Sequence, residues 1–400
     1  MTATSSTVGD RRRAALARAD AMRRHPTGAG PARRAATPPP TAFYVIVVVA
    51  FVLTMLGLVM VLSATSISQF HQGNSPWRLF NRQLLWAVLG FVGLWVAMRV
   101  PTRRWRPFII PGFIAACGLM VLPFLPGIGD RVNDASSWVA IGPINFQPSE
   151  FLKLALLVAC ASLLANRRNE LHDPMRTLFP VLGLAALACM LCMAQGDLGS
   201  AIVLGAIVFF MAFIAGAPML PMTVAGVAGA VVAGAFVVSS PRREARFTAF
   251  MDIAAHKDHL SYQTWQAMIA MAQGGVTGSG VGRGSNKLGE FLPLAHSDFI
   301  FAVVAEELGM IGVIAVLGGF VVLAYAGVQV ALATPDRFHG LLAGGIVGWF
   351  VVQAIINVGG VTGMMPVTGL TLPFFSAGGS SLFVTLVATG LLLNVARNVR

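Results

Sequence analysis

Long apolar runs separated by short polar stretches dominate the hydrophobic pattern of this sequence. A run of about 20 apolar residues is long enough to cross a bilayer as an α-helix. Ten such runs can be counted, at about residues 43–64, 83–98, 107–125, 149–165, 178–194, 199–216, 221–240, 299–329, 340–358 and 378–396. Their residues do not alternate between apolar and polar, as the strands of a membrane barrel would. The pattern predicts an all-α polytopic membrane protein with ten transmembrane helices.

The composition supports this class and sets the N-terminus apart. Hydrophobic residues make up 56% of the 400 residues and charged residues only 11%, unlike a soluble globular domain. The first 42 residues instead hold eight arginines and a run of three prolines, with no apolar segment that would indicate a signal peptide. We expect a disordered basic cytoplasmic tail at 1–42 and one membrane domain over 43–400.

The distribution of Lys and Arg over the short loops predicts the orientation of the helices. If the N-terminus is cytoplasmic, the inner loops and the C-terminus carry ten basic residues and the short outer loops carry three. Both termini are therefore predicted to be cytoplasmic, and the large loop between helices 7 and 8, about residues 241–298, extracytoplasmic. The net charge of +12 is assigned to the tail and to positions near anionic lipid, so nucleic acid is not an expected partner.

The segment FLPLAHSDFIFAVVAEELG, residues 291–309, places three carboxylates at the start of the eighth apolar run. Asp298 stands at the junction of loop and helix, and Glu306 would lie about 12 Å deeper in a straight helix. Carboxylates at membrane depth usually face a polar cavity and have a partner. Two interpretations stay open here: Asp298 is a base at the water–membrane boundary, or it caps the eighth helix.

Two further segments, one with charged residues and one rich in glycine, are predicted to lie on the same extracytoplasmic side of the membrane. In SSWVAIGPINFQPSEFLKL, residues 136–154, Glu150 and Lys153 are three apart and share a helix face. They form either an internal ion pair that pins helices together, or Lys153 is a cation lining a cavity that receives an anion. The glycine-rich GGVTGSGVGRGSNK, residues 274–287, has no nucleotide-binding spacing. It is either a flexible loop or, with nearby basic residues, a binding site for a lipid phosphate.

A fourth segment, NVGGVTGMMPVTGLTLPFFSAGGSS, lies at residues 357–381 between two membrane helices. Its six glycines and two prolines favour a re-entrant or broken-helix element. Such backbone is tolerated at membrane depth only against protein or a water-filled cavity. Asp197, in QGDLGS at 195–200, is a further acid between the fifth and sixth helices and is either a turn residue or part of the site.

Together with YQTWQAMIAMAQGGVTGSGVGRGSNKL at 262–288, these blocks resemble the SEDS family (FtsW, RodA and SpoVE). The details, such as NVGGVTG and GLTLP, are closest to the division branch, FtsW. The matching blocks extend from residue 136 to 381 in the family's order. The sequence departs from the family pattern at Leu294, Gly196, Ala377 and Ala267.

The resemblance implies a peptidoglycan glycosyltransferase that polymerises lipid II in septal wall synthesis, at the bacterial cytoplasmic membrane. It places the family's catalytic aspartate on Asp298, as the general base of an inverting transfer. The substrate-binding residues expected on this basis are Lys153, Glu150, Trp138, Arg246, Gln266, Lys287, His296, Glu306, Ser380 and Ser381. A class B penicillin-binding transpeptidase and other divisome membrane proteins are the expected partners. The lipid diphosphate already activates the donor, so no nucleotide is expected; a divalent cation, Mg²⁺ or Mn²⁺, is left open.

Three other functions are weighed against this one. A RodA-like elongation polymerase shares the same motifs. A lipid II flippase would need polar residues reachable from both sides of the membrane, whereas the candidate residues gather on the outer side. A scaffold that only recruits a partner enzyme would tolerate replacement of Asp298 by Asn.

Overall fold

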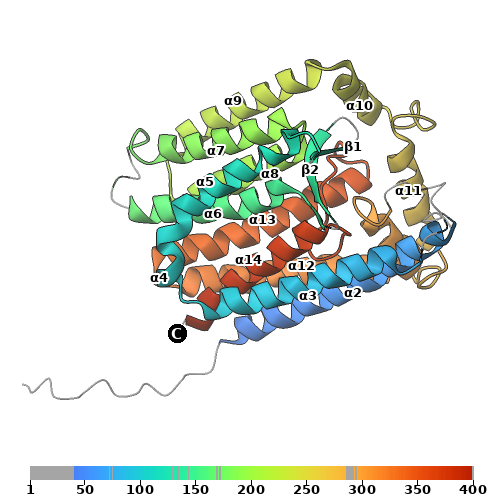
Figure 1. Ribbon diagram of the computed structural model, residues 1–400, viewed down its shortest axis with the longest axis horizontal. Helices are drawn as coiled ribbons and strands as arrows, with labels where there is room; N and C mark the ends of the chain where they lie inside the picture. The colour runs from blue at the N-terminus through green and yellow to red at the C-terminus, as the bar shows by residue number, and fades with distance from the viewer. Residues whose placement is uncertain are drawn as a thin grey trace, which may run out of the picture. The chain divides into compact units, whose positions relative to one another are not determined.

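The computed structural model describes residues 40–398, except residues 72, 74, 128, 133–134, 143, 168–169, 171–172, 285–291 and 293–294. Residues 1–39, and with them nearly all of the predicted tail, lie outside the described residues, as do Lys287 and Leu294. The described part is a bundle of long helices with one small sheet beside it (Figure 1).

Helices occupy all ten predicted apolar runs. The single-helix runs are α2 (Thr41–His71), α3 (Arg78–Arg99), α6 (Pro148–Asn166), α7 (Leu178–Ala194), α8 (Leu198–Ala215), α9 (Met219–Val238), α12 (Ile300–Ala333), α13 (Arg337–Val361) and α14 (Gly379–Asn398). The third run is covered by three short pieces, η1 (Arg106–Phe108), α5 (Ile109–Leu119) and η2 (Leu122–Phe124), and a fourth, α4 (Thr102–Trp105), precedes it. Within the described residues, nine spans are long and apolar enough to cross a membrane, and α7 is a shorter apolar helix of 17 residues.

Local sequence signals explain several helix ends. Asp197 is the N-cap of α8, where its carboxylate accepts a hydrogen bond from the Ser200 N–H at 2.8 Å. Asp336 caps α13 in the same way through the His339 N–H. Pro148 stands in the first turn of α6, where its missing N–H costs nothing. The turn interpretation of Asp197 thus agrees with the structure.

A small antiparallel sheet occupies the predicted outer loop at 126–148. Its strands are β1 (Gly129–Val132), β2 (Ala135–Ile141) and β3 (Ile144–Phe146), in the order β1-β2-β3. Trp138 on β2 stands opposite Asp130 on β1. The prediction of an all-α chain missed this sheet because three- to seven-residue strands leave little periodic signal beside helices of 17 residues or more.

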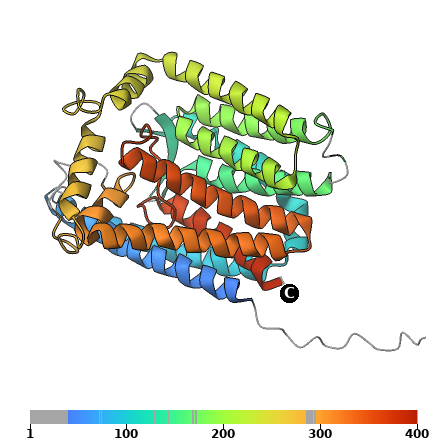
Figure 2. The same cartoon turned by 180° about the vertical axis from the view of Figure 1, so that it is seen from behind.

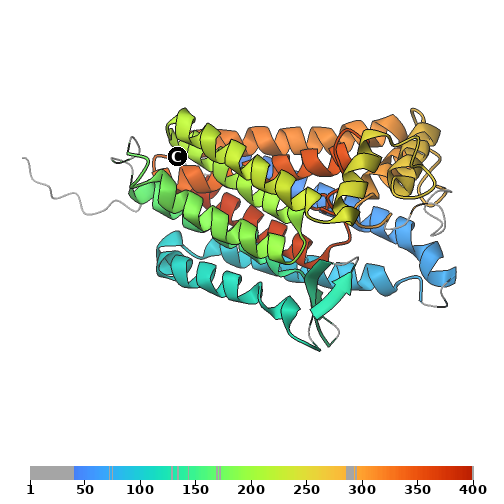
Figure 3. The ribbon, with the colours of Figure 1, turned by 90° about the horizontal axis from the view of Figure 1, so that it is seen from above.

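The predicted outer segments gather at one end of the bundle. The large loop contains two helices, α10 (Pro241–Met251) and α11 (Tyr262–Gly274). Figure 3 shows the sheet and the α10–α11 segment at the end opposite the C-terminus. The start of α2 lies at the same end as the C-terminus (Figure 2). The described chain therefore enters and leaves the bundle at one end, and the assignment of that end to the cytoplasmic side stays a prediction.

Close helix packing holds the core together. Helix α14 packs along α3, and α12 packs against α2 and α13. At the α3–α14 contact, a Cβ added to Gly390 would lie 2.4 Å from the Leu94 carbonyl oxygen. Only glycine allows this approach, as is common between membrane helices. Helix α9 is at the periphery, with Met222 as its buried residue and many exposed apolar side chains that suit lipid contact.

Helix α12 is broken near its start. Its 34 residues would extend about 51 Å as one straight helix, longer than a bilayer core. At Gly309 the backbone adopts φ 65° and ψ −162°, a region open essentially to glycine. The glycine-rich segment runs alongside this break, and the Met310 N–H and Ile311 N–H donate to the Gly275 and Val276 carbonyls. Residues 300–308 are therefore a short separate helix.

We expect Gly309→Ala to lower the free energy of unfolding by about 1–3 kcal/mol or more, because alanine is strained in this conformation. Its Cβ would also lie 2.4 Å from the Gly278 nitrogen. Unfolding of the detergent-solubilised protein measures the change. Gly318→Ala, in the same helix with open space around the added Cβ, is the control and should keep wild-type stability. Equal stability of the two variants would contradict the break as a required feature.

Candidate active site

Asp298 lies in a turn, residues 295–299, that immediately precedes α12. Phe299 is the N-cap residue of α12, and no side-chain hydrogen bond caps the helix there. The interpretation of Asp298 as a helix cap is therefore wrong. The straight-helix geometry that related Asp298 to Glu306 is wrong as well, because the helix begins only at Ile300.

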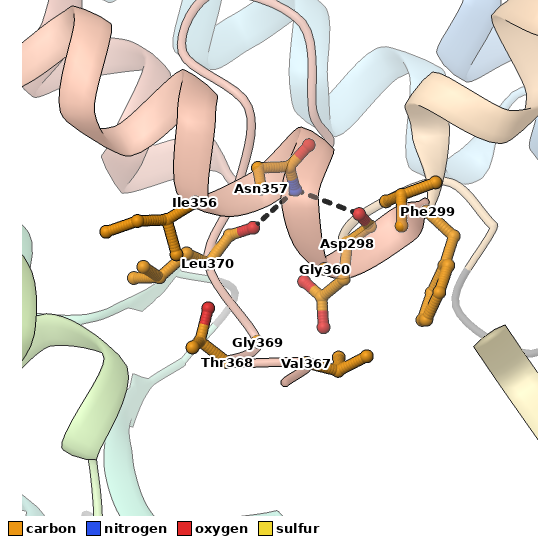
Figure 4. A pocket seen from close by; sticks show the side chains of 10 residues that line it. Asp298, Phe299, Ile356, Asn357, Gly360, Val367, Thr368, Gly369 and Leu370 are labelled. Carbon is orange, nitrogen blue, oxygen red and sulfur yellow. Dashed lines mark hydrogen bonds between the residues drawn. The ribbon is translucent and has the colours of Figure 1, made fainter. Parts of the chain in front are cut away.

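A small pocket surrounds the Asp298 side chain. It is lined by the turn, by the C-terminal end of α13 and by the segment at residues 367–370. Figure 4 shows the carboxylate pointing between these walls, above Val367 and Gly369. A Cβ placed on Gly369 would lie 3.8 Å from the Asp298 Oδ2. The predicted broken-helix segment thus forms one wall around the acid.

Burial changes the acidity of this turn. Desolvation raises the pKa of Asp298 to about 6, although a hydrogen bond from Ser297 opposes the change. A carboxylate with a pKa near neutrality is suited to general-base catalysis. Burial, together with the nearby Arg82 guanidinium of α3, lowers the pKa of His296. Both effects favour the neutral imidazole of His296. Its backbone carbonyl accepts a hydrogen bond from the Ala377 N–H at 2.9 Å.

A row of polar side chains on α13 holds the pocket walls. The Asn357 Nδ2 donates to the Asp298 carbonyl at 2.9 Å and to the Leu370 carbonyl at 2.7 Å. One turn earlier, the Gln353 Nε2 donates to the Thr371 carbonyl at 2.8 Å. Two side chains four residues apart therefore fix two consecutive carbonyls of the broken segment.

Lys153 and Glu150 form a buried ion pair on α6. The Lys153 Nζ lies 2.8 Å from the Glu150 Oε2 and 3.0 Å from the Gln353 Oε1, and Lys153 is 0% exposed. The Trp349 ring lies 5.6 Å away as a cation–π partner, and its Nε1 also donates to Gln353. The structure matches the ion-pair interpretation, and contact of Lys153 with substrate stays a prediction.

The two serines predicted to bind substrate, Ser380 and Ser381, are buried at the start of α14. The Ser381 Oγ lies 2.8 Å from the Thr371 Oγ1, and the Ser380 Oγ accepts from the Gln147 N–H. A hydrogen-bonded chain therefore runs from Glu150 through Gln353 to Ser381. It connects α6, α13, the broken segment and α14.

Glu306 and Glu307 lie on the short helix before the break and contact the glycine-rich segment. Both Glu307 oxygens accept from the Ser63 Oγ of α2, and Oε2 also accepts from the Gly282 N–H. A Cβ on Gly284 would lie 2.9 Å from the Glu306 Oε2. The described part of the glycine-rich segment, residues 274–284, packs on α12, and this close packing accounts for its small residues. Phosphate binding by the segment stays a prediction.

The structure does not bring every predicted residue to the Asp298 pocket. Gln266 is half-buried on α11, which packs on α12. Trp138 is half-buried in the sheet, and Arg246 is exposed on α10. Their contacts with substrate stay predictions.

Comparisons with known proteins show the family to which this chain belongs. The family profile described as "Cell cycle protein", for FtsW, RodA and SpoVE, matches residues 43–400. The chain belongs to the FtsW/RodA/SpoVE family. A probable peptidoglycan glycosyltransferase FtsW of Mycobacterium tuberculosis is 39% identical over 351 residues, covering 88% of this chain and 67% of the relative. The stage V sporulation protein E of Bacillus subtilis is 36% identical, covering 88% of this chain and 96% of the relative.

Solved structures of the family have the same fold. A chain from a peptidoglycan synthase complex that coordinates polymerization and crosslinking aligns with a TM-score of 0.71 at 28% identity, covering 89% of this chain and 97% of the other. The rod shape determining protein RodA of Thermus thermophilus aligns with a TM-score of 0.65 at 30% identity, covering 88% and 96%. The polytopic helical membrane fold expected from the apolar runs is therefore confirmed.

Sequence reasoning missed Asn357 and Gln353 in this family member. A signal was present, because Trp349, Gln353 and Asn357 follow at intervals of four on an otherwise apolar helix. Their hydrogen-bonding targets are loop carbonyls, which carry no sequence signal of their own.

The divalent cation also stays a prediction. Among the described residues, no three His, Cys, Asp or Glu side chains come together in a way that could hold a metal ion. Within the described part of the chain, the side chains around Asp298 therefore do not supply three such ligands.

We expect Lys153→Met to destabilise the protein by about 3–5 kcal/mol, because it leaves the buried Glu150 carboxylate without its cation. The double variant Glu150→Gln with Lys153→Met should be more stable than Lys153→Met alone, since it removes both charges. Reversible unfolding in mixed micelles measures both. Equal stabilities of the single and double variants would contradict a tightly coupled pair.

Proposed function

We propose that this chain is a peptidoglycan glycosyltransferase that polymerises lipid II at the outer face of the bacterial cytoplasmic membrane, during septal wall synthesis. The observation that carries the proposal is Asp298, a carboxylate of raised pKa held in a pocket at the predicted outer end of the bundle. The names of the relatives support the reaction class. The predicted orientation, with both termini cytoplasmic, puts the pocket on the side where the wall is built.

In the proposed mechanism Asp298 is the general base. Its carboxylate takes the proton from the sugar 4-hydroxyl of lipid II, and the hydroxyl oxygen attacks the anomeric carbon of the lipid-linked donor. The bond from that carbon to the diphosphate oxygen breaks, and the lipid diphosphate leaves with the electron pair. Attack from the face opposite the leaving group inverts an α-linkage to a β-linkage.

The leaving diphosphate develops negative charge that cations have to stabilise. Arg246 and Lys287, in the outer loop, are the proposed cations. Lys153 could contribute only if its contacts with Glu150 and Gln353 were rearranged.

A class B penicillin-binding transpeptidase is the proposed partner, with other divisome membrane proteins. The structural relative described as coordinating polymerization and crosslinking supports such a pairing. Polymerisation and cross-linking act on the same nascent strand, so a complex of the two enzymes would pass the strand directly between them.

We expect Asp298→Asn to lower lipid II polymerisation at least about 100-fold, because it keeps the shape and removes the base. The assay follows glycan ladders formed by the purified protein with its cognate transpeptidase. The control is Asp336→Asn, which should stay active. Asp336 caps the end of α13 that lies away from the pocket, and asparagine preserves this helix cap. Full activity of Asp298→Asn would rule out the mechanism and direct attention to lipid II movement across liposomes.

The activity of the wild type should also depend on pH. Because the base works only when ionised and its pKa is raised to about 6, activity should be low below pH 6 and rise to a plateau by about pH 7. Polymerisation rates at constant ionic strength measure the profile. A profile that is flat from pH 5 to 8 would contradict Asp298 as the base.

A further inference from the structure

Asn357 holds the backbone on both sides of the Asp298 pocket at once. Its Nδ2 has two hydrogens, and the two carbonyls that accept from this atom belong to Asp298 and Leu370, at 2.9 and 2.7 Å. One carbonyl belongs to the turn that carries the base, and the other to the wall facing it. Figure 4 shows the amide bridging the two.

The orientation of this amide is set by those two carbonyls. Asn357 is 4% exposed, and its Oδ1 has no hydrogen-bond partner among the described residues. A flipped amide would bring its oxygen against two acceptors, so the nitrogen has to face them. The buried oxygen without a partner is the cost of fixing both walls with one side chain.

We propose that Asn357 is a positioning residue for the glycosyl transfer. It sets the separation between the Asp298 turn and the 367–371 wall, and thereby aims the carboxylate at the acceptor hydroxyl. This inference rests on the proposed function. Asn357 does not touch the reacting atoms; it acts through the backbone of Asp298, and small displacements of a catalytic group have large effects on rate.

The chain offers a matched control at the other end of the bundle. Asn394 on α14 is 1% exposed, and its Nδ2 donates to the carbonyls of Ala97, Met98 and Val100 at 2.8–3.0 Å. The two asparagines thus share burial and chemistry. Only Asn357 contacts the turn that carries Asp298.

The test measures kcat and KM for lipid II polymerisation in the full-length protein with its transpeptidase, at matched amounts of folded protein. We expect Asn357→Ala to lower kcat about 10- to 100-fold with KM within about twofold. Asn357→Ser, whose hydroxyl can donate to one of the two carbonyls, should lose less. Asn394→Ala should keep kcat near wild type, even where its melting temperature falls.

The outcomes separate this inference from the proposed function. Suppose that the wild type polymerises lipid II, that Asp298→Asn does not, and that Asn357→Ala is as active as the wild type. This result would overturn the positioning role alone. An equal loss of kcat in Asn357→Ala and Asn394→Ala would overturn the positioning role too. So would a result in which neither Asn357 variant folds while Asn394→Ala does, because Asn357 would then serve stability only. Wild type without any polymerisation would overturn the proposed function itself.

Discussion

Irregular backbone inside an apolar bundle has to find its hydrogen-bond partners within the protein, and both halves of the site are built around this constraint. On one side, the glycine-rich segment satisfies the N–H groups that the break at Gly309 releases. On the other, the amides of Gln353 and Asn357 satisfy the carbonyls of Thr371 and Leu370. The same contacts that satisfy the backbone also fix the walls around Asp298.

The buried ion pair belongs to this framework. Lys153 uses Glu150 for charge and Gln353 for a further hydrogen bond, so the orientation of Gln353 depends on α6. With its oxygen held by Lys153 and Trp349, Gln353 can only present its nitrogen to Thr371. The Glu150–Lys153 ion pair, far from Thr371 in the sequence, thereby fixes the position of the pocket wall. The site is thus supported by rigid helices rather than by free loops.

The sequence predicts the helices well because the apolar runs are longer and more continuously apolar than the helices of a soluble protein core. It also singles out Asp298 as a candidate, since a carboxylate at a membrane boundary is costly and stands out. The break at Gly309 could not be predicted, because 43 glycines are present and only tertiary contact with the glycine-rich segment selects this one. The start of α12 after Asp298 was missed as well, because the apolar pattern of the sequence continues through the turn without a local signal for the helix start.

The framework also bears on the choice between an enzyme and a flippase. A flippase opens alternately to each side, so helices have to separate first at one end and then at the other. Here the ends of α6, α13 and α14 near the Asp298 pocket are joined through Gln353 and Thr371. The C-terminal end of α14 is joined to the end of α3 by the hydrogen bonds of Asn394. Alternating access would break buried hydrogen bonds at both ends of the bundle, whereas the proposed glycosyl transfer at the Asp298 pocket leaves all of them in place.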